Sequence, residues 1–128
     1  MTWALYVRAI LAVRRGRPDE AIALVRESLT RIRELHDKFA LVYVLVPLAA
    51  AAVLKGDDAW ASRILGVRDA VTDRTGVIVV DKSVQDLRDQ AERDACARLG
   101  ADQWAASYGA GRKSSVDALL KDIDSLPA

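Results

Sequence analysis

Few side chains in this sequence have the chemistry needed for catalysis or metal binding, and they are not grouped. His36 is the only histidine and Cys96 the only cysteine among the 128 residues. His36 has no second histidine or cysteine nearby, and Cys96 lies among charged residues of a helical segment. A metal site needs several ligands, and a catalytic thiol or imidazole needs an activating neighbour. We therefore expect no catalytic residue, no metal ligand and no cofactor, and we predict that the chain is not an enzyme.

Most charged residues lie at the expected ends of helices or on their exposed faces. The carboxylates Asp57 and Asp58 fall at an expected helix start, and Arg14, Arg15 and Arg17 fall at an expected helix end. These are the signs of charge that a helix dipole favours at each end. No phosphate-binding loop of the form G-x-x-x-x-G-K-[ST] is present, so we expect no ATP site of this type in the chain. No helix-turn-helix pattern is present either, and we expect no direct contact with nucleic acid.

The longest apolar stretch, residues 39–54 (FALVYVLVPLAAAAVL), organises the rest of the sequence. It contains sixteen residues with no charge and only the Tyr43 phenol as a polar group. A helix of this length spans ~24 Å, which is short of the ~30 Å core of a bilayer. Because a helix that is apolar on every side must be covered on every side, we interpret it as the central core helix rather than a membrane segment.

Composition indicates one folded domain spanning residues 1–128. Lys and Arg together number 19 against 18 Asp and Glu, and 52% of the residues are hydrophobic. Such a balance gives no general attraction to nucleic acid or to anionic lipid. A single cysteine suits a reducing compartment, and Met1 leads directly into an apolar segment without the basic region of a signal peptide. We predict a cytoplasmic protein.

Apolar periodicity, together with the positions of glycine and proline, predicts an all-α fold of about seven helices. A four-residue run, VIVV, is expected to be an extended connector, and GAGRKSS a loop before the last helix. Ser83 with Asp86 resembles a capping box, while Trp104 and Tyr108 are expected to anchor the last helices on the core. The expected helices cover about residues 3–15, 18–36, 39–54, 57–75, 83–99, 101–108 and 116–123.

The first four expected helices form an internal repeat with a spacing of 40 residues. VRRGRPDEA at 13–21 aligns with VLKGDDAWA at 53–61. Small residues recur at Ala9 and Ala49, and again at Ala21 and Ala61, where they allow the helices of each hairpin to approach closely. This pattern is typical of tetratricopeptide-like units. We predict two antiparallel hairpins in a right-handed superhelical stack over residues 1–76, followed by a connector and a three-helix C-terminal cap over 77–128.

Two segments carry a resemblance to a known family. LAAAAVLKGDDAWA combines a helix rich in small residues with a G-D-x-x-x-A turn, and ILGV follows it. Further on come Leu99-Gly100, Trp104, Tyr108, a Gly-Arg pair and Ser115. Together these segments resemble the C-terminal helical-repeat region of large actinobacterial STAND-class ATPases, which are transcriptional regulators with LuxR-type or adenylate-cyclase-like modules. The connector VIVVDKS departs from the polar, proline-containing spacer of that family.

The resemblance, which covers about residues 40–120, implies that the chain is part of a larger regulator. The function we predict is a non-enzymatic protein-interaction or sensory scaffold. The alternative from a different class is a stand-alone helical bundle that binds an apolar small ligand in its interior.

The predicted inner wall of the repeat is almost entirely apolar. A large apolar wall is not left in water, so it must be covered by the C-terminal helices folding back, by a second chain or a neighbouring repeat, or by an apolar peptide. The candidate partner-binding residues are Trp3, Tyr6, Ile10, Val13, Tyr43 and Val46.

The first helix is apolar over most of its circumference, with Arg8 as the one charge before its end. One neighbouring helix cannot cover so wide a face. We therefore expect a protein partner at this helix, either a second copy in a two-fold dimer or a flanking repeat of a parent chain, and no membrane contact.

Overall fold

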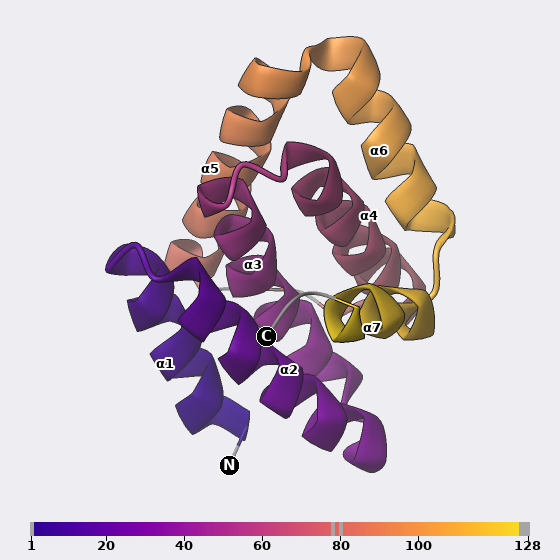
Figure 1. The fold of residues 1–128 in the computed structure, drawn as a ribbon. Coiled ribbons are helices and arrows are strands. Elements are labelled where there is room, and N and C mark those ends of the chain that lie inside the picture. The colour runs from indigo at the N-terminus through magenta and orange to yellow at the C-terminus, as the bar shows by residue number, and fades with distance from the viewer. Residues whose placement is uncertain (1, 78, 80, 126–128) are drawn as a thin grey trace.

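The computed structural model describes residues 2–77, 79 and 81–125, and within these residues it is all-helical. The predicted fold class and the number of helices are thus confirmed for the described part of the chain (Figure 1). The helices are α1 (Thr2–Arg14), α2 (Pro18–Leu35), α3 (Lys38–Leu54), α4 (Asp58–Thr75), α5 (Lys82–Leu99), α6 (Ala101–Lys113) and α7 (Val116–Asp124).

Local capping chemistry explains where most helices begin. The side chain of Asp37 accepts a hydrogen bond from the amide of Ala40 at the start of α3, and Ser115 accepts one from Ala118 at the start of α7. Such side chains satisfy amides that have no partner in the first turn. At α5 the cap differs from the prediction: Asp81, not Ser83, is the N-cap, and its carboxylate accepts from the amide of Ser83.

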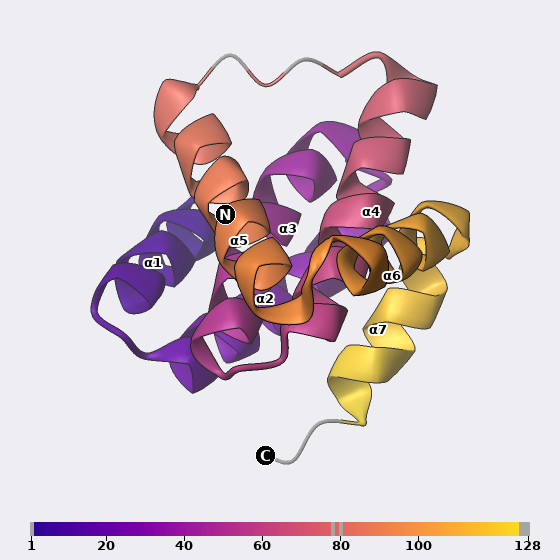
Figure 2. The ribbon, with the colours of Figure 1, turned by 90° about the horizontal axis from the view of Figure 1, so that it is seen from above.

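Helix α3 is the central element, as its uncharged sequence predicts. Every residue from Ala40 to Val53 is buried. The helix packs against α1, α2, α4 and α5, and Figure 2 shows it between α1 and α4. No helix in the described part of the chain has the length and apolarity needed to cross a membrane.

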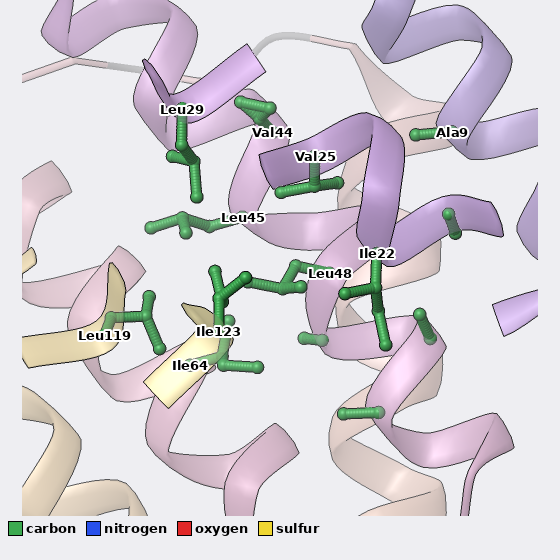
Figure 3. Close-up of a cluster of buried hydrophobic side chains, with 14 of the residues drawn as sticks. Ala9, Ile22, Val25, Leu29, Val44, Leu45, Leu48, Ile64, Leu119 and Ile123 are labelled. Carbon is green, nitrogen blue, oxygen red and sulfur yellow. The ribbon is translucent and has the colours of Figure 1, made fainter. Parts of the chain in front are cut away.

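The hydrophobic core extends from α3 into both hairpins and into α7. Figure 3 shows Leu48 of α3 and Ile64 of α4 close to Ile123 of α7. The alanines that the repeat placed at close helix contacts (Ala9, Ala21, Ala49 and Ala61) are all fully buried. Helix α7 therefore completes the core beside α2 and α4.

Helix α6 is longer than predicted and crosses α4 at very short range. The sequence GAGR, expected to be a loop, continues the helix to Lys113. A β-carbon on Gly111 would overlap the carbonyl oxygen of Arg63, and one on Gly66 would overlap that of Tyr108. Gly111 and Gly66 thus allow two helix backbones to touch, and Gly111, which suggested a break in the helix, is instead required by the packing.

The expected anchors and connector are found where the prediction placed them, as far as the structure describes them. Trp104 and Tyr108 of α6 are half-buried against the core, with their rings stacked at 4.7 Å. Val77 and Val79 of the connector also pack on the core outside any helix. Ile78 and Val80 lie outside the described residues.

Candidate interaction surface

Four aromatic side chains from α1 and α3 form one cluster near the start of both helices. The ring of Trp3 lies 5.6 Å from Tyr6, 6.1 Å from Phe39 and 5.4 Å from Tyr43, each at a steep angle. Edge-to-face contacts of this kind are favourable because the positive ring edge meets a negative ring face. The cluster brings together three of the predicted partner-binding residues: Trp3, Tyr6 and Tyr43.

Helix α5 covers the α3 part of the predicted inner wall. Tyr43 and Val46 are buried, and Val84 of α5 completes a small cluster with them. Tyr6 and Leu87 pack against this cluster while remaining half-exposed. The C-terminal helices thus fold back over part of the wall, which was one of the three expected ways of covering it.

The α1 part of the wall remains open as a groove between α1 and α5, which we call the α1/α5 groove. It has a volume of about 220 Å³. The predicted residue Ile10 lies in it, half-exposed, whereas Val13 is half-buried against the main core. The groove is lined by Tyr6, Val7, Ile10, Leu11, Arg14, Asp81, Ser83, Val84 and Leu87.

A row of apolar side chains on α1 is exposed to solvent. Trp3 is 40% exposed, Val7 53% and Leu11 41%. These residues are spaced by four, so they lie one above another on the same side of the helix. We call them the α1 stripe. Phe39, which contacts Trp3 and is 48% exposed, extends the apolar surface onto α3. The exposure of these side chains agrees with the expectation that the neighbouring helices cannot cover the whole apolar surface of α1.

The charges beside the α1 stripe are positive. Helix α1 carries Arg8 and Arg14 but no acidic residue, and Arg15 follows directly. None of these three arginines forms an ion pair within the described residues, whereas Arg17 pairs with Glu20 at 3.6 Å. The surface is therefore an apolar stripe with cations beside it that form no ion pair within the described part of the chain.

Tyr6 lines the α1/α5 groove and packs against the cluster of Tyr43, Val46 and Val84. Burial raises its pKa to about 12, and the nearby negative charge of Asp81 acts in the same direction. The phenol is therefore neutral at physiological pH, and its ring contributes apolar surface.

A polar cluster that the sequence did not predict joins α4, α5 and α6. One oxygen of Asp69 accepts hydrogen bonds from Arg88 and from the Tyr108 hydroxyl, both at 2.6 Å, while Arg68 donates to the other oxygen at 2.9 Å. Burial alone would raise the pKa of Asp69, but these hydrogen bonds outweigh it and hold the pKa below 3.8. Both oxygens of the carboxylate thus have donors from neighbouring side chains, and we interpret the cluster as a structural tie.

The signal for this cluster was present in α5. Its buried positions are Val84, Arg88, Ala91 and Ala95, so the arginine lies on the same face as the apolar residues. A charged residue at a position that the apolar pattern places inside predicts a buried partner of opposite charge. Which residue is the partner depends on how α4 packs beside α5.

The structure places the two isolated reactive residues at the end of α2 and within α5. His36 is the left-handed residue that ends α2, and Cys96 is half-buried with a free thiol. Within the described residues, no group of three metal-ligating side chains could hold an ion. His36 borders an open hollow of about 360 Å³ whose apolar side is formed by Ile32, Leu41 and Val116.

Comparison with protein-family models, with curated proteins and with solved structures finds no match to this chain.

Proposed function

We propose that this chain is a non-enzymatic protein-interaction module that binds its partner through the α1 stripe and the α1/α5 groove. The observation that carries the proposal is the exposure of Trp3, Val7 and Leu11 on one side of α1, next to an open groove. Contiguous apolar surface bordered by polar residues is typical of sites where proteins bind other molecules.

The form of the surface favours a helical partner. Successive residues of the α1 stripe are about 6 Å apart along the helix axis, so the stripe is about 12 Å long. A partner helix presents its own apolar residues once per turn at similar intervals, which is how amphipathic helices bind in grooves. The α1/α5 groove beside the stripe provides room for such residues.

We further propose that the module is part of a larger cytoplasmic regulator of the STAND class, in which it serves as a tetratricopeptide-like scaffold or sensor. The support is the 40-residue repeat together with the motifs around Gly56 and between Leu99 and Ser115. Its partner would then be a flanking repeat or another domain or protein of the same signalling system.

The alternative function is the binding of a small apolar ligand, and the hollow beside His36 is the place where such a ligand could bind. The hollow beside His36 has apolar residues on one side, but Arg33, Lys38 and Asp117 border it. It is also open to solvent, so an apolar ligand would remain partly in water. The ligand-binding alternative is therefore the weaker of the two.

Binding of a designed peptide tests the proposed function. The probe is an amphipathic peptide of ~18 residues, long enough to form a helix, with leucine once per turn, uncharged polar residues elsewhere and a fluorescein label. We expect its fluorescence anisotropy to rise on titration with the protein, and Leu11→Glu to weaken binding at least ~10-fold because a charge would enter the interface. Ala23→Glu, on the exposed face of α2, is the matched control and should bind as the wild type does.

The proposal is wrong if Leu11→Glu binds the peptide as tightly as the wild type. It is also wrong if the wild-type protein binds no peptide while dodecanoate raises its melting temperature, which would support the small-ligand alternative. Circular dichroism confirms in each case that the variant is folded.

A further inference from the structure

We infer that the partner of the α1 stripe is an acidic amphipathic helix from a different protein or domain, and not a second copy of this chain. The inference rests on the proposed function and adds the chemistry of the partner. It follows from the charges that surround the stripe.

The cations lie along one border of the stripe and at its C-terminal end, where Arg14 follows Val7 by seven residues. Arg8 and Arg15 are seven residues apart and therefore lie on one border, two turns from each other. Arg14 lies at the end of the α1/α5 groove, next to Leu11. All three side chains are on exposed residues. A helix docked along the stripe would place the residues that flank its apolar face within reach of these guanidinium groups.

The acidic residues near the groove are already engaged. Asp81, which lies at the edge of the groove, caps α5 by accepting a hydrogen bond from the amide of Ser83. Asp86 pairs with Lys82 at 3.0 Å. Asp81 keeps its negative charge, but the three arginines outnumber it at this surface, so Asp or Glu on the partner would complement the excess positive charge.

A second copy fits this surface poorly. In a two-fold contact each α1 would bring Arg8, Arg14 and Arg15, and neither α1 would contribute an acidic side chain. The like charges would oppose the apolar attraction. The positive charge of α1 therefore favours a neighbouring domain or another protein over the dimer that the sequence also allowed.

The test compares two peptides that differ only in charge. Both carry the same leucine pattern, but the flanking positions are glutamate in one and lysine in the other. We expect the acidic peptide to bind the wild-type protein at least ~10-fold more tightly at low salt, with the difference shrinking as salt is added because these charges are exposed. The double variant Arg8→Glu/Arg15→Glu should reverse the preference.

A matched variant separates local charge from total charge. Arg74→Glu/Arg93→Glu makes the same change in net charge on exposed residues of α4 and α5. It should retain the preference for the acidic peptide. If it loses that preference as fully as the α1 variant, then net charge and not the α1 surface selects the partner, and the inference is overturned.

Three further outcomes would overturn the inference, and they separate its failure from the failure of the proposed function. Equal binding of both peptides, abolished by Leu11→Glu, would show an interaction surface without an acidic preference. A dimer in sedimentation equilibrium that Leu11→Glu dissociates would identify a second copy as the occupant. Co-sedimentation with phosphatidylserine vesicles, lost in Leu11→Glu, without binding of either peptide would identify a membrane and overturn both proposals.

Discussion

Gly111 of α6 lies directly against the backbone of Arg63 in α4, at a separation that leaves no room for a β-carbon at position 111. In the same contact between α4 and α6, Gly66 of α4 lies against the backbone of Tyr108 in α6. The contact holds α6 to the side of α4 (Figure 1). The close packing of α6 on α4 thus depends on two glycines.

Gly111→Ala should therefore destabilise the protein by roughly 1–3 kcal/mol, the usual cost of overpacking a close contact. Gly109→Ala is the matched control, because a β-carbon there meets no atom within 4 Å and alanine favours the helix. Urea denaturation followed by circular dichroism measures both. Equal stabilities for the two variants would contradict the close approach of α6 to α4.

Removing the carboxylate of Asp69 should destabilise the protein more than removing an exposed one. In Asp69→Ala the buried guanidinium of Arg88 loses its closest partner, and breaking a buried pair typically costs about 3 kcal/mol. Asp86→Ala removes only the exposed pair with Lys82, which is worth well under ~1 kcal/mol. Similar midpoints in urea for both variants would show that the Asp69 cluster is not a structural tie.

The same cluster predicts a pH dependence at the acid side. Because hydrogen bonds hold the pKa of Asp69 below its ordinary 3.8, its contribution to stability is fully present above that pH. This contribution is lost as the pH falls through the lowered pKa. The free energy of unfolding of Asp69→Asn, measured in urea from neutral to acid pH, should therefore fall less steeply than that of the wild type.

Tyr6 predicts a loss of stability at the alkaline side. Burial, reinforced by Asp81, raises its pKa from 10.0 to about 12, so the neutral phenol favours the folded state. Its contribution is complete below pH 10 and disappears as the pH rises through about 12. In Tyr6→Phe this part of the loss should be absent, which chemical denaturation across that pH range would show. A steeper loss in the variant would contradict the placement of Tyr6.

The burial of α3 predicts at which of its positions a charged substitution is compatible with folding. Ala49 is fully buried, so Ala49→Arg would place an unpaired charge in the core and should prevent folding to a soluble protein. Leu54→Arg makes a similar change at a side chain that is 49% exposed, and it should fold. Soluble, cooperatively folding Ala49→Arg protein would disprove the central position of α3.

The sequence predicted the features that depend on local pattern. An uncharged run of sixteen residues has to be buried on all sides, which identified α3 as the centre of the fold. Glycines that end helices, such as Gly76, gave boundaries close to those observed. The wide apolar surface of the first helix likewise predicted that its neighbours would not cover it completely, and Trp3, Val7 and Leu11 are exposed there.

The features that the sequence did not predict depend on contacts between distant segments. Gly109 and Gly111 looked like a loop because glycine weakens an isolated helix, and the close approach of the Arg63 backbone explains why α6 requires glycine at position 111. Asp69 and Tyr108 are 39 residues apart, and their hydrogen bond follows from the crossing of α4 and α6. No local pattern specifies such a crossing.

Nuclear magnetic resonance mapping tests the central claim most directly. The backbone amides of the labelled protein are followed while the acidic amphipathic peptide is added. We predict that the largest shift changes lie on α1 between Trp3 and Arg14, with further changes at Phe39, Val84 and Leu87 around the α1/α5 groove. If the largest changes instead surround the hollow at Ile32, Leu41 and Val116, or if the spectrum does not change, then the α1 stripe is not the binding surface of this protein.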